Sequence, residues 1–225
     1  MDREATNTGG AAMRKTGILA IVGVLALFFA GCGGGDSRPD LFVFEQLSDQ
    51  TVDADIAYTG VGSPTIFPAS STGTIQVGVD GGGTEYRGFL DFLIDGKIPY
   101  NADVRSAYVE VFVASVPFGA NVPVLMELVD FPLPLIATDY FRTPPSPYLP
   151  AVLARSIFTF RPSDVFAPRV PVRVEVTSLL REALFRAQPE FQLRILLDPA
   201  VPGPAIVQLD DDAAQTAPLL HVEYF

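Results

Sequence analysis

The sequence contains no tryptophan, one cysteine and one histidine among its 225 residues. A single cysteine excludes an internal disulfide and any cysteine-rich zinc site. The lone histidine, His221, excludes a multi-histidine metal site and leaves only one candidate base for a Ser-His-Asp triad. Basic residues are also scarce, with 15 Lys and Arg against 26 Asp and Glu, and this acidic balance argues against non-specific nucleic-acid binding. Most enzyme classes and DNA-binding functions are therefore disfavoured.

The composition is nevertheless that of a folded protein. Hydrophobic residues make up 48% of the chain, which excludes wholesale disorder. The length allows one domain or two small ones.

The N-terminal segment has the plan of a secretory signal. Arg14 and Lys15 precede an uncharged apolar run over residues 17–31, and small residues end that run. The run has about 15 residues, fewer than the ~20 that a membrane-spanning helix needs. Because Met13 directly precedes the two basic residues, translation is expected to begin there, with Met1 as the alternative start.

Residues 29–32, Phe-Ala-Gly-Cys, resemble the lipobox of bacterial lipoproteins. In such proteins the cysteine becomes the new N-terminus and carries lipid, which implies lipidation of Cys32 and membrane attachment through the lipid. Gly33, standing where lipoproteins retained in the inner membrane tend to carry Asp, implies the outer membrane or the cell surface. We expect a signal peptide at 1–31 and a flexible tether at 32–44. The alternative is a plain N-terminal membrane helix with an incidental cysteine.

Beyond residue 40, short apolar stretches alternate with clusters of Gly, Pro and Asp, which predicts an all-β domain over 45–225. Apolar residues at every second position in 104–114 are typical of strands with one face on a core. We expect an antiparallel β-sandwich or jelly roll. The expected strands are 41–47, 51–57, 73–79, 87–94, 104–114, 122–130, 155–160, 170–176, 191–197, 204–209 and 220–224.

Two segments differ from this pattern. Residues 177–187 carry an apolar stripe at helical spacing, which predicts one short amphipathic helix that Thr177 caps and that plugs an open end of the sandwich. Residues 131–150 contain six prolines, a density that forbids a central strand and predicts a stiff surface loop.

Three stretches together resemble the DNRLRE-type domain, a β-sandwich related to carbohydrate-binding modules of bacterial polysaccharide systems. They are residues 75–92, with a strand, a Gly-rich turn, an arginine and an apolar strand; residues 104–111; and residues 174–187 with the closing strand 217–224. The resemblance implies a sandwich fold and polysaccharide binding. Tyr86-Arg87 stands where the family has two basic residues, and the tryptophan that relatives often carry is missing.

Carbohydrate binding needs aromatic faces for sugar rings and polar groups for hydroxyls. If the strands around residues 90 and 110 pair, their outward side chains form an aromatic and charged patch. The alternative is that this face packs under the proline-rich segment or against another strand. Two further arginines with outward strand positions are candidates for gripping an anionic polysaccharide. The candidate binding residues are Arg87, Asp91, Tyr108, Glu110, Phe112, Arg173 and Arg194.

Several aspartates in expected turns are candidate ligands for a structural calcium ion, which prefers hard oxygen donors. These are Asp53, Asp55, Asp80, Asp210, Asp211 and Asp212. The alternative is a set of solvated turn carboxylates, and Asp80-Gly81-Gly82-Gly83 itself is typical of a hairpin turn.

No catalytic residues are expected, since His221 has no nucleophile motif beside it. Two functions follow from the sequence. One is a lipid-anchored, non-catalytic module that binds extracellular or cell-wall polysaccharide. The other is a structural or adhesive surface protein that contacts other envelope proteins.

Overall fold

Strands are the main regular element of the computed structural model, which describes residues 40–141, 152–165, 170–212 and 215–225. The alternating segments of the sequence become strands, as expected, because period-2 apolar patterns bury one face of a sheet. The strands in the described ranges are β1 (Phe42–Leu47), β2 (Ala54–Tyr58), β3 (Thr65–Pro68), β4 (Thr74–Val79), β5 (Glu85–Leu93), β6 (Val104–Ser115), β7 (Val122–Val129), β8 (Ala154–Phe160), β9 (Val172–Glu175), β10 (Glu190–Leu197), β11 (Ala205–Asp210) and β12 (Leu219–Tyr224).

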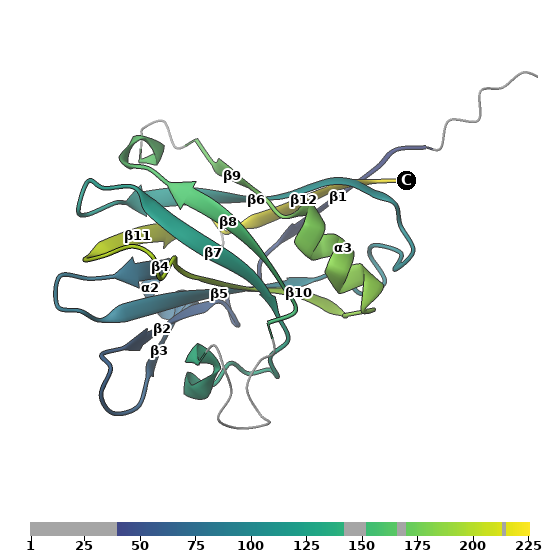
Figure 1. Cartoon of the computed structure of the whole chain (residues 1–225). Coiled ribbons are helices and arrows are strands. Elements are labelled where there is room, and N and C mark those ends of the chain that lie inside the picture. Colours follow the sequence, from purple (N-terminus) through teal and green to yellow (C-terminus); the bar gives the residue numbers. More distant parts are fainter. Residues whose placement is uncertain (1–39, 142–151, 166–169, 213–214) are drawn as a thin grey trace, which may run out of the picture. The chain divides into compact units, whose positions relative to one another are not determined.

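All the strand pairings are antiparallel, and the hydrogen-bonded order is β1-β12-β6-β11-β4-β5-β10-β7-β8, with β9 on β6, β2 on β5 and β3 on β2. The long strand β6 joins two layers, because residues 104–111 pair with β12 and β9 whereas residues 112–115 pair with β11. The sheet therefore curls into two facing layers (Figure 1). The predicted antiparallel β-sandwich is confirmed.

The main core lies between the two layers. Ala107, Val109 and Val111 point into it from β6 and are at most 1% exposed. Phe191, Leu193 and Ile195 do the same from β10. The inward and outward faces of β6 are those that its alternation predicts.

The predicted helix is α3 (Thr177–Phe185), and it packs against β6, β7, β8 and β10. Its buried stripe, Leu179, Leu180, Ala183 and Leu184, joins the main core, which confirms the expected plug. Thr177 does not cap the helix, because Val176 holds the N-cap position. Instead, the Thr177 hydroxyl accepts a hydrogen bond from the Ala107 backbone N–H at 2.7 Å, so it ties α3 to β6.

Residues 131–141 form a loop without strand structure, as their prolines predict, but buried side chains anchor it to the sheet. Phe131 and Tyr140 are 2% and 4% exposed and build a second, smaller core with Ile56, Phe89 and Val129. This core covers the outer face of the layer that contains β5, β7 and β10. Residues 142–150, with the other four prolines, lie outside the described residues.

Short helical turns complete the described chain: α2 (Ala69–Thr72) and the 3₁₀ turns η1 (Ala137–Tyr140) and η2 (Pro162–Asp164). None of these was expected. Leu41–Phe225 forms one compact unit. The expected signal, Cys32 and most of the tether lie outside the described residues, and within those residues no helix is long and apolar enough to span a membrane.

Candidate functional site

The aromatic patch predicted from β5 and β6 does not form. β5 pairs with β2, β4 and β10, whereas β6 pairs with β9, β11 and β12, so the two strands are not neighbours, and residues 104–111 of β6 lie in the opposite layer. Arg87 and Asp91 are thereby separated from Tyr108, Glu110 and Phe112. The expectation was wrong because the alternation of a strand fixes its two faces but not its neighbours.

Tyr108, Glu110 and Arg173 do come together, on the outer face of the layer formed by β1, β12, β6 and β9. Arg173 Nε lies 2.9 Å from Glu110 Oε1, and its guanidinium lies 4.7 Å from the centroid of the Tyr108 ring. His221 stacks on the same ring at 4.6 Å, and its Nδ1 lies 2.9 Å from Glu45 Oε1. His221 is thus a member of this cluster rather than an isolated surface residue. Because Arg173 and His221 pack against the Tyr108 ring, its faces are not open for stacking on a sugar.

Phe112 is half-buried further along β6, where the strand pairs with Asp210 of β11. It does not join Tyr108 in an aromatic platform, and the described residues offer no tryptophan to replace it. The outer face of this layer therefore lacks the stacking surface that sugar rings use.

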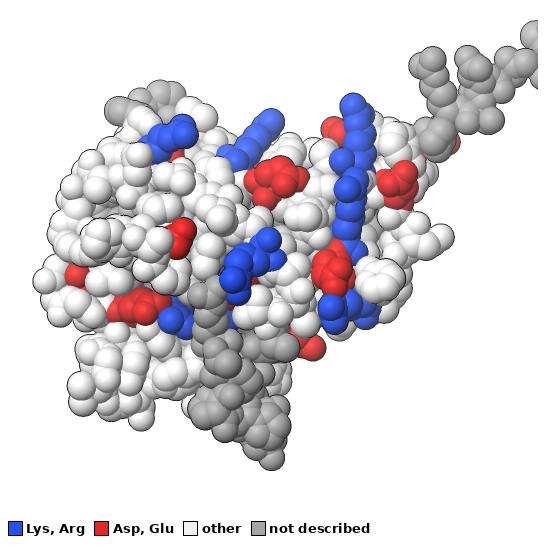
Figure 2. Space-filling model, viewed as in Figure 1, with Lys and Arg blue, Asp and Glu red and all other residues white. Residues whose placement is uncertain are grey.

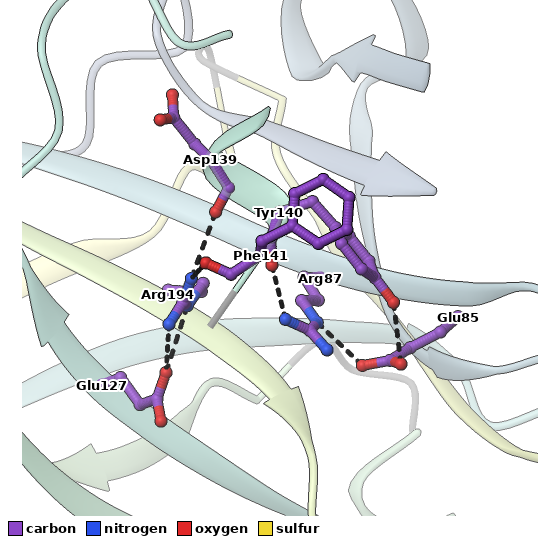
Figure 3. A network of polar contacts seen from close by, with 7 residues as sticks. All are labelled: Glu85, Arg87, Glu127, Asp139, Tyr140, Phe141 and Arg194. Atoms are coloured by element: carbon purple, nitrogen blue, oxygen red, sulfur yellow. Dashed lines mark hydrogen bonds and ion pairs between the residues drawn. The ribbon is translucent and has the colours of Figure 1, made fainter. Parts of the chain in front are cut away.

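Arg194 lies on the face of β10 that points away from the main core, as its strand position predicts, but it is not exposed as a binding residue would need to be. Its side chain is fully buried, and it donates to Glu127 Oε2 from Nη2 at 2.8 Å and from Nε at 3.1 Å (Figure 3). Its Nη1 donates to the backbone carbonyls of Asp139 and Phe141, each at 3.1 Å. The polar face of β10 is buried because residues 131–141 cover it, which strand alternation alone does not reveal.

Arg87, on β5, also binds the segment of residues 131–141. Its guanidinium donates to the backbone carbonyl of Tyr140 and lies 4.0 Å from the Tyr140 ring centroid (Figure 3). Its Nε donates to Glu85 Oε1 at 2.8 Å, and the Tyr140 hydroxyl donates to Glu85 Oε2 at 2.8 Å. Arg87 and Arg194 therefore hold three successive carbonyls of residues 139–141, which is a structural role rather than ligand recognition.

A cleft of about 520 Å³ lies where the turn after β1 meets the end of β5 and the start of β10. Three leucines on its rim, Leu47, Leu93 and Leu133, are 45–48% exposed. Polar side chains complete the lining: Gln46, Ser48, Asp49, Gln50, Thr51, Asp91 and Glu190. Apolar surface beside convergent polar groups is the usual make-up of a ligand site. Of the binding residues expected from the sequence, only Asp91 lies here.

The cleft is acidic. Gln192 Nε2 donates to Asp91 Oδ1 and to Glu190 Oε2, each at 3.0 Å, which holds the two carboxylates close together. Burial, and then the neighbouring carboxylates, raise the pKa of Asp91 to about 6 and also raise the pKa of Glu190. No described Arg or Lys lines this cleft. On the face drawn in Figure 2, by contrast, basic and acidic side chains are interspersed over a mostly uncharged surface.

The expected calcium ligands divide into two groups. Asp80 caps the β4–β5 hairpin turn, where its Oδ1 accepts from the N–H groups of Gly82 and Thr84. Asp212 is exposed, and Asp210 is half-buried at the end of β11. These three are turn or strand-end residues, and Asp80 fits the alternative of a plain hairpin.

The other three expected ligands are buried rather than solvated. Asp53, Asp55 and Asp211 are at most 1% exposed. Asp55 Oδ1 accepts from the Gln76 N–H at 3.0 Å, whereas Asp53 Oδ1 accepts from the Asp91 N–H at 2.8 Å, directly beneath the cleft. Among the described residues, no three Asp, Glu, His or Cys side chains lie close enough together to form a metal site by themselves.

Most residues of the cleft were not predicted from the sequence. Leu47, Leu93, Gln46 and Glu190 come from three different strand ends, and no local motif marks them. Leu93 follows five buried residues and is exposed at the end of β5, which only the structure reveals. Comparison of the chain with protein-family models found no match, and comparison with curated protein sequences found none either.

Proposed function

We propose that this chain is a lipid-anchored, non-catalytic binding module of the cell envelope, and that its ligand is a polysaccharide held in the cleft between β1, β5 and β10. The observation that carries the proposal is the cleft itself. It combines three half-exposed leucines with carboxylates and amides that are suited to sugar hydroxyls. The lipobox-like sequence at 29–32 and the resemblance to DNRLRE-type domains support the same reading.

The charge of the cleft narrows the ligand class. Asp49, Asp91 and Glu190 accept hydrogen bonds from hydroxyl and amine groups but repel carboxylates and sulfates. Arg194, which the sequence offered as a grip for anionic chains, is buried in an ion pair. The proposed ligand is therefore an uncharged or amine-bearing polysaccharide rather than an acidic one.

A glycan array probed with the full chain in mild detergent tests this proposal, followed by calorimetry on any glycan that binds. Glu190→Gln removes one cleft charge and keeps the side-chain shape, so it should weaken binding roughly tenfold or more, the usual effect of losing a hydrogen bond to a charged group. Glu110→Gln, on the Tyr108 face, is the matched control and should leave the affinity unchanged. Release of reducing ends is not expected.

The alternative is an adhesive protein that contacts other envelope proteins. The same three leucines favour it, since exposed apolar side chains also mark protein interfaces. Two results together would favour the adhesive protein over the polysaccharide-binding module. No glycan on the array would bind, and the wild type would capture an envelope protein that Leu93→Ser does not capture.

A further inference from the structure

Three buried carboxylate oxygen atoms beneath the cleft lack hydrogen-bond partners of ordinary geometry among the described residues. They are Asp53 Oδ2 and both carboxylate oxygens of Asp211, and the buried Ser48 hydroxyl lies beside Asp53. Asp53 and Asp211 are 0% exposed and Ser48 is 8% exposed, so bulk water does not solvate them. Buried polar atoms are normally paired, and buried carboxylates are costly unless a positive charge compensates them.

These groups lie beside one another although they come from distant parts of the sequence. Repulsion from Asp211 is among the causes, after burial, that raise the pKa of Asp53 to about 9, while the adjacent Ser48 hydroxyl lowers it. Burial, and then Asp212, raise the pKa of Asp211 to about 6. Gln50, in the same turn as Ser48, connects this turn to Asp211, because its side-chain amide donates a hydrogen bond to the Asp211 backbone carbonyl.

We propose that Asp53, Asp211 and the Ser48 hydroxyl bind a single calcium ion beneath the cleft. Two carboxylates neutralise a divalent cation, and the ion supplies the partner that these three carboxylate oxygens lack. Calcium accepts six to eight oxygen ligands, including hydroxyls, backbone carbonyls and water, so two carboxylates are sufficient as its charged ligands. Asp55, Asp80, Asp210 and Asp212 are not part of this proposed site.

The site is connected to the cleft. Ser48 lines the cleft, and Asp91, which also lines it, donates its backbone N–H to Asp53. Asp49 joins the same turn through hydrogen bonds from its N–H to Asp91 O and from the Asp53 N–H to Asp49 O. A bound ion therefore fixes the 48–53 turn against β5, and stability rather than chemistry is its contribution.

The test is calcium titration of the metal-free full chain, followed by melting temperature and by calorimetry, with magnesium as the comparison ion. Calcium should bind and raise the melting temperature, while magnesium should act weakly because it demands tight octahedral geometry. Asp53→Asn and Asp211→Asn should each weaken calcium binding roughly tenfold or more. Both variants should fold, because Asn has the size and shape of Asp and does not carry the cost of burying an ionised carboxylate.

Asp55→Asn is the matched control. Asp55 is as buried as Asp53 and also has an oxygen, Oδ2, without a described partner, but its Oδ1 bonds to Gln76 on β4. This variant should keep the full response to calcium. The proposal would be overturned if calcium left the melting temperature of the wild type unchanged, or if calcium raised the melting temperatures of all three variants equally. Asp53 and Asp211 would then be a carboxyl pair that shares a proton. These outcomes do not depend on whether any glycan binds.

Discussion

Arg194 is the residue whose environment differs most from an ordinary strand position. It is a fully buried cation whose donors are divided between Glu127 on β7 and two carbonyls of residues 139–141. Arg155 lies 2.9 Å from the other Glu127 oxygen, at the edge of the cluster. Removal of Arg194 leaves the buried Glu127 with only the partly exposed Arg155 as a cationic partner, and it takes the donor away from the Asp139 and Phe141 carbonyls.

Arg194→Met should therefore destabilise the protein by ~3–5 kcal/mol, the usual cost of breaking a buried ion pair. Arg173→Met is the control, since the Arg173 side chain is 66% exposed and its pair with Glu110 should contribute about 1 kcal/mol or less. Urea unfolding of both variants measures the difference. Equal stabilities would show that the Arg194 cluster contributes no more than a surface pair.

The buried carboxyl of Asp55 provides a pH prediction at the same scale. Burial raises its pKa to about 7, against a backbone hydrogen bond from Gln76 that lowers it. The folded protein thus holds this proton more tightly than the unfolded chain, whose carboxyl titrates near pH 4. The resulting stabilisation is complete below about pH 4 and is lost as the pH rises toward 7.

Asp55→Asn should be more stable than the wild type at pH 8 in metal-free buffer, by on the order of a few kcal/mol, and this advantage should disappear near pH 4. Urea unfolding of both proteins between pH 4 and pH 8 measures it. A constant difference across that range would mean that Asp55 titrates normally.

At the scale of elements, α3 closes one end of the main core, and the 131–141 segment closes the outer face of the layer that contains β5, β7 and β10. Both work by burying apolar side chains that the strands leave uncovered. The helix uses Leu179, Leu180, Ala183 and Leu184, whereas the segment uses Phe131 and Tyr140 together with the two arginine contacts to its backbone.

Leu180→Ala should destabilise the protein by ~2–5 kcal/mol, because Leu180 is fully buried and its truncation leaves a cavity. Phe185→Ala on the same helix should change stability by less than about 0.5 kcal/mol, because Phe185 is 84% exposed. Thermal unfolding monitored by circular dichroism compares the two. A small effect at Leu180 would contradict the role of α3 as part of the core.

At the scale of the whole molecule, the sandwich from Leu41 to Phe225 is one compact unit with its own core. We expect this unit to fold and to bind its proposed ligand without the N-terminal segment. That segment then has a different expected role, which is to attach the domain to a membrane through Cys32.

Labelled palmitate should be incorporated into the wild-type protein in a bacterial host and should be absent from Cys32→Ser. The physical reason is that only the cysteine thiol provides the attachment atom for the lipid. Gel fluorography after membrane fractionation provides the measurement. If neither the wild type nor Cys32→Ser is labelled and both remain in the membrane fraction, the result would favour the plain membrane helix instead.

The sequence by itself determined the described strands other than β3, together with α3 and the hairpin turn at Asp80. In each case the signal is local: alternation in β6 and β10, the apolar stripe 179–184, and a short polar side chain that bonds the N–H groups of Gly82 and Thr84. It also selected Asp53 and Asp211 as carboxylates of interest. Each of these patterns lies within one strand, helix or turn, so the structure that it predicts does not depend on contacts with distant residues.

Only the tertiary structure decided which strands are neighbours and which faces are covered. β5 and residues 104–111 of β6 lie in opposite layers, which separates Asp91 from Tyr108, and residues 131–141 bury Arg194. The cleft and the Asp53–Asp211 pair likewise join side chains from strand ends far apart in the chain. Pairing, register and layer depend on contacts between distant residues, and alternation along a strand is the same whichever partner it meets.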